Sequence, residues 1–258
     1  MTILCYHAVD PDWHSPLSVP PDVLRAQCRW LTRNRRVVAL GQAVALGERS
    51  SIPGGMCVLT FDDGFASVYE HALPVLREER LPATVFIVAA TLTAQGQPVD
   101  WVDDPPSHTL RTLTLEQLLE MREAGVGIGS HSWAHRNLVD LGDGECIAEL
   151  RDSRELLEDL LRQPVPFFAY PRGLHNARVR TLTQQAGYTH GFALPEAWEP
   201  RGPYALPRVG IYPYDASAAL RAKTSAWYVP VRMSPVFPAL RAASGRGVLA
   251  RSIRRSRS

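Results

Sequence analysis

The sequence predicts a single α/β barrel, in which parallel strands alternate with amphipathic helices that pack around the sheet. Two observations predict this class. Short runs rich in β-branched and aromatic residues recur along the chain, and segments with helical spacing of apolar residues lie between them. The chain has 258 residues, of which 45% are hydrophobic and 21% are charged, so it is long enough to bury one full core.

Eight runs are predicted to be strands. Each is short, mainly apolar and bounded by turn residues, as expected for strands that are buried on both faces of a parallel sheet. In chain order they span residues 2–6, 36–40, 56–61, 83–88, 126–130, 166–170, 189–194 and 206–211.

Four segments between these runs are predicted to be helices. The segment 114–125 opens on Thr114, carries an acidic residue in its first turn and closes on Gly125. The segment 176–187 also closes on a glycine. The remaining two helices are expected at residues 20–34 and 144–163. Since no repeat and no linker interrupts this alternation, residues 1–225 are expected to form one catalytic domain.

Residues 226–258 are predicted to form a basic C-terminal tail. Six arginines and no acidic residue lie between residues 241 and 258, and apolar and aromatic residues precede and interleave them. This composition suits peripheral contact with phospholipid headgroups, or with the phosphates of a lipid-linked sugar. The alternative is a solvated, disordered tail. Nucleic acid is not predicted as a partner, because the net charge is only +2 and the basic residues are confined to one end.

The first residues contain no basic segment followed by a long apolar stretch, and no apolar run has the length of a membrane span. The four cysteines show no CxxC spacing, so they are expected to be reduced thiols in the core. We therefore expect a cytoplasmic protein, which would lie at the inner face of the membrane if its tail binds phospholipid.

Polar side chains follow several predicted strands, where the active sites of parallel barrels lie. Asp62 and Asp63 follow the strand 56–61, and two adjacent carboxylates repel each other unless a cation is near. His131 and His135 follow the strand 126–130, four residues apart, which would place both rings on one side of a helical turn. With one carboxylate they would form a three-ligand site of the catalytic zinc type. The alternative is an ordinary surface pair of histidines.

Three segments carry a resemblance to a known family. "TFDDG", "SHSWAH" and "AYPRG" occur in this order, and they resemble the first three motifs of the carbohydrate esterase family 4 polysaccharide deacetylases, the NodB homology domain. The resemblance implies a distorted barrel of the (β/α)7 type, and removal of N-acetyl or O-acetyl groups from sugars with one divalent metal ion, usually Zn²⁺. It further implies that Asp62 is the catalytic base and that Asp63, His131 and His135 are the metal ligands.

The sequence departs from the family pattern at the arginine that holds the base. The aligned position in the third motif is Ala169, and Arg172 stands where the family has an aromatic residue. The role would then fall either to Arg172 or to Arg208, which lies in the predicted strand 206–211. Trp101, in a polar and proline-rich loop, is expected either to stack on a sugar or to cap the core.

The second departure concerns the general acid. No histidine follows His190, whereas the chain opens on "LCYHAV". This opening resembles the circularly permuted branch of the family, in which an N-terminal Tyr-His supplies the acid. His7 is therefore the candidate general acid, and a histidine buried in the core is the alternative.

We expect, from these features, a metal-dependent hydrolase that removes an acetyl group, in the first place an N-acetyl group, from a carbohydrate or a lipid-linked glycan. Two alternatives stay open. One is a deformylase or other amide hydrolase acting on a lipid-linked or small aminosugar. The other is a carbohydrate-binding protein that keeps the fold without turnover.

Overall fold

The computed structural model describes residues 1–49, 55–93, 95–195, 202–235 and 237. Within these residues, parallel strands form a closed barrel, which confirms the predicted fold class. Strand β1 closes the ring by pairing with β3 on one side and with β8 on the other. The strands of the ring are β1 (Thr2–Tyr6), β3 (Met56–Phe61), β4 (Ala83–Ile87), β5 (Gly127–Ser130), β6 (Phe167–Ala169), β7 (His190–Ala193) and β8 (Leu206–Gly210).

Strand β2 (Arg36–Val37) lies outside the ring, beside the first two residues of β3. It is shorter than the expected run 36–40, because helix α2 (Leu40–Arg49) already begins at Leu40. The amide of Val38 still donates a hydrogen bond to the carbonyl oxygen of Cys57, at 3.0 Å.

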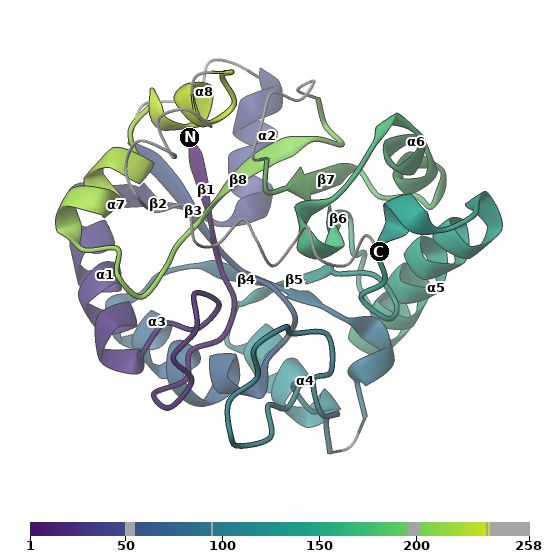
Figure 1. Cartoon of the computed structure of the whole chain (residues 1–258), viewed down its shortest axis with the longest axis horizontal. Coiled ribbons are helices and arrows are strands. Elements are labelled where there is room, and N and C mark those ends of the chain that lie inside the picture. The colour runs from purple at the N-terminus through teal and green to yellow at the C-terminus, as the bar shows by residue number, and fades with distance from the viewer. Residues whose placement is uncertain (50–54, 94, 196–201, 236, 238–258) are drawn as a thin grey trace.

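The helices form an outer layer around the strands (Figure 1). Four of them lie where the sequence predicts helices: α1 (Pro21–Asn34), α4 (Leu115–Glu123), α5 (Asp143–Leu161) and α6 (Ala177–Gln185). Four further helices were not predicted from the sequence: α2, α3 (Leu73–Glu79), α7 (Ser217–Lys223) and α8 (Tyr228–Arg232).

Helix α3 shows why one of these was missed. Pro74 has no amide hydrogen, and its ring clashes with the preceding turn of a regular α-helix, so it usually marks a break. In the structure Pro74 lies in the first turn of α3, directly after a widened π-helical turn at Val68–Ala72. The wider turn accommodates the proline, and the chain continues as a helix.

The predicted start of α4 is confirmed by its hydrogen bonds. The Thr114 hydroxyl accepts from the amide of Gln117 at 3.1 Å, and the Gln117 side chain accepts from the amide of Thr114 at 3.0 Å. This reciprocal capping satisfies two amides at the helix start. Helix α6 is capped by Asn176, whose side chain accepts from the amide of Val179.

The barrel strands are buried on both faces, so polar groups inside them need partners within the protein. Every residue of β1 and β3 is buried. The Thr60 hydroxyl, for example, donates to the carbonyl oxygen of Leu4 at 2.8 Å. All four cysteines are buried free thiols, as predicted.

The start of the predicted tail packs against the barrel domain. Tyr228 and Val229 of α8 contact the main hydrophobic core, and the Arg232 side chain donates to the carbonyl oxygen of Pro195 at 2.8 Å. The arginine-rich segment 241–258, on which the predicted membrane contact depends, lies outside the described residues. Among the helices that the structure describes, none combines the length and the apolar character of a membrane span.

Candidate active site

The carboxyl ends of the barrel strands bring the predicted site residues together. Asp62 and Asp63 leave β3, His131 and His135 leave β5, and His7 leaves β1. Because β3 pairs directly with β1, the amide of Asp62 donates to the carbonyl oxygen of Tyr6 at 3.0 Å. The site therefore lies at the end of the barrel where parallel-barrel enzymes carry their chemistry.

Asp62 is held by a fully buried arginine. Arg208, on β8, donates from Nη1 to Oδ1 of Asp62 at 2.6 Å and from Nη2 to Oδ2 at 2.7 Å. The side chains of both residues are almost completely excluded from solvent. A planar guanidinium that binds both oxygens fixes the plane of the carboxylate as well as its charge.

Burial alone would raise the pKa of Asp62, but the charge of Arg208, its hydrogen bonds and the nearby histidines together outweigh this effect. The pKa of this carboxyl therefore lies well below its usual range. Asp62 stays ionised at every pH at which the protein is expected to work.

Arg172 points elsewhere. Its Nη2 donates to the carbonyl oxygen of Trp101 at 3.1 Å, and its Nη1 lies 3.7 Å from Oδ2 of Asp103. Of the two candidates for holding the base, Arg208 contacts Asp62, whereas Arg172 fastens the loop that contains Trp101. The expected contact of Arg172 with Asp62 is therefore replaced by a contact with this loop.

Asp63, His131 and His135 form a compact, buried group. Oδ1 of Asp63 lies 3.5 Å from Nε2 of His131 and 3.2 Å from Nε2 of His135. One carboxylate oxygen and two imidazole nitrogens thus face a common point, and their separations are within the range of a metal site.

The protonation state of His131 indicates which kind of ligand this group can hold. Its Nδ1 lies 2.8 Å from the carbonyl oxygen of Ala169, which can only accept, so Nδ1 carries the proton. Burial lowers the pKa of His131 to about 4, so the ring is neutral and Nε2 has a free lone pair. A lone pair directed at a carboxylate oxygen is unfavourable unless a cation lies between them. The donor set therefore fits a divalent metal ion.

The loop that carries the two histidines is not helical. Ser132 and His135 have φ values of 70° and 56°, in the left-handed region that L-residues rarely adopt. We expected a helical turn from the spacing of four, and the structure brings the rings together by these two unusual conformations instead. The Ser132 hydroxyl accepts from the amide of His135 at 3.0 Å, and buried Glu149 of α5 accepts from the amide of Ala134 at 2.9 Å.

Asp63 is also in the left-handed region, with a φ of 70°, and Gly64 follows with a φ of 66°, which a glycine adopts without steric cost. A Cβ atom at Gly64 would lie 3.1 Å from the side chain of Ile87, so a larger residue there would also require Ile87 to shift. The turn after β3 thus directs two successive carboxylates to different partners, Asp62 to Arg208 and Asp63 to the histidines.

Trp101 closes one side of the histidine group. Its indole ring stacks on His135 with the ring centroids 5.2 Å apart, and its Nε1 donates to Oδ1 of Asp63 at 3.2 Å. The sequence left open whether Trp101 stacks on a sugar or caps the core, and the structure places it on the site itself. The contact between Trp101 and His135 could not be predicted from their spacing in the sequence, because it depends on the path of the loop between β4 and α4.

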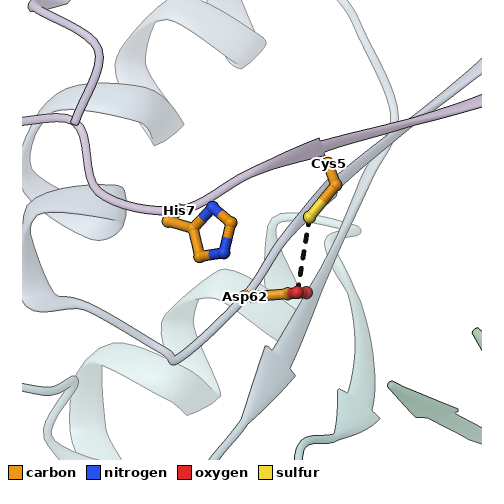
Figure 2. A group of neighbouring side chains, drawn as sticks. All are labelled: Cys5, His7 and Asp62. Atoms are coloured by element: carbon orange, nitrogen blue, oxygen red, sulfur yellow. Dashed lines mark hydrogen bonds between the residues drawn. The ribbon is translucent and has the colours of Figure 1, made fainter. Parts of the chain in front are cut away.

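His7 is half-buried and lies beside Asp62 and Cys5 (Figure 2). The thiol of Cys5 donates to Oδ2 of Asp62 at 3.3 Å, so Cys5 is a further contact of the predicted base. Cys5 and His7 are two residues apart at the end of one strand, so they can face the same side. The sequence indicated only a core thiol at Cys5, and this contact with Asp62 was not predicted.

Comparisons with known proteins identify relatives that match most of this chain. A Bacillus subtilis (strain 168) protein, YxkH, is 28% identical over 226 residues, which cover 86% of this chain and 75% of that protein. The poly-beta-1,6-N-acetyl-D-glucosamine N-deacetylase of Staphylococcus aureus (strain MRSA252) is 25% identical over 204 residues, covering 74% and 67%.

Solved structures show the same fold. Streptococcus pyogenes deacetylase PplD, in complex with acetate, has a TM-score of 0.73 at 25% identity, covering 87% of this chain and 98% of that one. IcaB from Ammonifex degensii has a TM-score of 0.73 at 24% identity, covering 87% and 97%. The polysaccharide deacetylase family matches residues 50–191, more than half of the chain. The chain therefore belongs to the polysaccharide deacetylase family and is a carbohydrate deacetylase.

Proposed function

We propose that this protein is a zinc-dependent N-deacetylase that acts on a glycan containing N-acetylated amino sugars. The observation that carries the proposal is the pair of adjacent carboxylates with separate partners. Asp63 faces the imidazoles of His131 and His135, while Asp62 is fixed and kept ionised by Arg208. This arrangement separates a group that binds a cation from a group that accepts a proton.

Asp63, His131 and His135 would hold the metal ion. One carboxylate and two histidines match the ligands of catalytic zinc sites, which keep a position open for water and substrate. Bound there, the ion would supply polarisation of the acetyl carbonyl and acidification of water. The ring of His131 is already oriented for this role, because its Nδ1–H donates to the carbonyl oxygen of Ala169.

Asp62 would act as the general base. Both of its oxygens are held by Arg208, so its position is fixed before substrate arrives. The proton of the attacking water would pass to Asp62. His7 would then donate a proton to the nitrogen of the amino sugar as the amide bond breaks. Its position beside Asp62 places both groups at one end of the barrel.

The metal assignment predicts that His131→Ala removes the bound ion. Loss of one of three protein ligands removes a large part of the binding free energy. We expect less than stoichiometric zinc by metal analysis after dialysis, and loss of acetate release. His175→Ala is the matched control, because His175 is not part of the group formed by Asp63, His131 and His135. This variant should retain one zinc per chain. Stoichiometric zinc in His131→Ala would contradict the assignment.

The acid assignment predicts that His7→Gln lowers turnover by about 10²- to 10⁴-fold, the usual contribution of a positioned proton donor. Glutamine keeps a polar side chain but cannot deliver the proton. Zinc content should stay at one per chain, because His7 is not a ligand of the proposed zinc site. An unchanged kcat would return His7 to the role of a structural histidine.

The Staphylococcus aureus relative is named for a β-1,6-linked polymer of N-acetyl-D-glucosamine. This name supports an N-acetylated glycan as the substrate class. We propose that acetate is released from N-acetylglucosamine oligosaccharides. The panel that tests this contains β-1,6- and β-1,4-linked oligomers, an O-acetylated oligosaccharide and an N-formylated amino sugar. Acetate from the N-acetylated oligomers is the expected result. Release from the O-acetylated or N-formylated compound alone would replace the proposal by an O-deacetylase or a deformylase.

A further inference from the structure

A second group of metal-binding side chains lies next to the proposed zinc site. Cys5, His7 and Asp62 each offer one ligand atom, and these atoms all lie within 4.8 Å of one another. Figure 2 shows the thiol of Cys5 directed at the carboxylate of Asp62, with the ring of His7 beside them. This group shares no residue with Asp63, His131 and His135.

We propose that Cys5, His7 and Asp62 form a second zinc site, which fills only when zinc is in excess and then inhibits the enzyme. The inhibition rests on the proposed function, in which His7 is the general acid and Asp62 is the general base. The existence of the site does not depend on the proposed function, since zinc binding requires only the three side chains. Thiolate, imidazole and carboxylate are the three kinds of ligand that proteins offer to zinc.

The backbone already supports the site. Strand β1 pairs with β3 in a continuous register from Thr2 opposite Cys57 to Tyr6 opposite Phe61. Cys5 therefore lies beside the end of β3, from which Asp62 projects. Its Sγ is 3.3 Å from Oδ2 of Asp62, a separation that two ligands of one ion can adopt without moving either strand.

Asp62 can bind an ion without releasing Arg208. The guanidinium uses one lone pair on each carboxylate oxygen, and a carboxylate has about four lone-pair sites. Zinc would take the place of the thiol hydrogen that Cys5 now directs at Oδ2. The S–H bond breaks, the proton leaves to solvent, and a sulfur–zinc bond forms with no change in oxidation state.

The same surroundings make this site weaker than the first. Arg208 is a buried cation in contact with Asp62, and it repels a second cation. Burial also raises the pKa of the Cys5 thiol, so zinc must displace a firmly held proton. The first zinc should therefore bind to Asp63 and the two histidines, and the second only at higher concentration.

Filling the second site would remove both proton-transfer groups at once. Asp62 bound to zinc cannot accept the proton of water, and His7 bound through its ring nitrogen cannot donate one. We expect excess zinc to lower turnover by about 10²-fold or more, the contribution of general acid and base catalysis.

Cobalt(II) tests the site by a signal that turnover does not affect. Thiolate ligation gives Co²⁺ a charge-transfer absorption in the near ultraviolet, and the first site contains no sulfur. The full-length protein is stripped of metal and titrated with Co²⁺. The first equivalent should add no thiolate band, and the band should grow during the second. Absence of the band at any excess of cobalt would overturn the proposal.

The variant Cys5→Ser tests whether Cys5 supplies the thiolate of the second site. The variant should bind the first equivalent normally, show no thiolate band and lose inhibition by excess zinc. Cys57→Ser is the matched control, because Cys57 is also a buried strand thiol but lies outside the group. It should keep both the band and the inhibition. A band that persists in Cys5→Ser would assign the thiolate to another cysteine and overturn the proposal.

The cobalt titration also separates two failures. If the protein shows no deacetylase activity but the thiolate band appears, the proposed function fails and the second site stands. If the protein is active and the band never appears, the second site fails and the proposed function stands.

Discussion

Arg208→Met is expected to destabilise the protein by about 3–5 kcal/mol, because it leaves the carboxylate of Asp62 buried without its partner. Arg208 is fully buried, and its two hydrogen bonds to Asp62 are short and charge-assisted. Methionine fills much of the same volume without a charge. Urea unfolding, with the free energy of unfolding extrapolated to water, measures the effect.

Two further variants make this result specific. Arg208→Met combined with Asp62→Asn should recover part of the lost free energy, since no unpaired charge remains buried. Arg172→Met is the matched control, because the Arg172 side chain is 39% exposed and contacts the Trp101 loop. We expect a change within about 0.5 kcal/mol there. If Arg208→Met were as stable as the parent protein, the buried ion pair would not be what holds Asp62.

Arg208→Met should also shift the pH dependence of any residual activity. In the parent protein, the charge of Arg208 keeps the pKa of Asp62 below its usual range. Removing that charge leaves the effect of burial, which raises the pKa of a carboxyl. The acidic limb of the profile of kcat/KM against pH should therefore move to higher pH.

Asp62→Asn is expected to lower turnover by about 10²- to 10⁴-fold while the zinc remains bound. An amide cannot accept the proton of water, and its NH2 group faces the donors of Arg208. Asp63, which is the proposed ligand, is unchanged. Acetate release and zinc content, measured on the same sample, test the two halves of this expectation.

Asp103→Asn is the control for Asp62→Asn. Asp103 is an exposed carboxylate in the loop that contains Trp101. The Asp103→Asn variant should have nearly the same turnover and zinc content as the parent protein. Full activity in Asp62→Asn would place the general base on another residue. Loss of zinc in Asp62→Asn would instead move Asp62 into the first metal site.

The sequence was sufficient to predict the barrel and the residues at its strand ends. Buried parallel strands appear as short apolar runs, and the side chains that follow them lie at one end of the barrel. Asp62, Asp63, His131, His135 and His7 were all found in this way. The choice between Arg172 and Arg208 could not be made from the sequence. Arg172 follows β6 and Arg208 lies inside β8, and only the closure of the barrel brings β8 next to β1.

Other features depend on contacts that leave no local signal. The contact of Cys5 with Asp62 joins residues 57 positions apart, and it follows from the pairing of β1 with β3. The approach of Trp101 to His135 depends on the path of a long loop. The left-handed conformation of His135 replaces the helical turn that the spacing suggested. In each case tertiary structure, rather than residue type or spacing, sets the geometry.

The most direct test of the account is acetate release from a β-linked N-acetylglucosamine oligosaccharide, measured on metal-stripped protein before and after one equivalent of zinc is restored. The account predicts no release from the stripped protein and recovery of activity with the single equivalent. Undiminished release from protein shown to contain no divalent metal would contradict it.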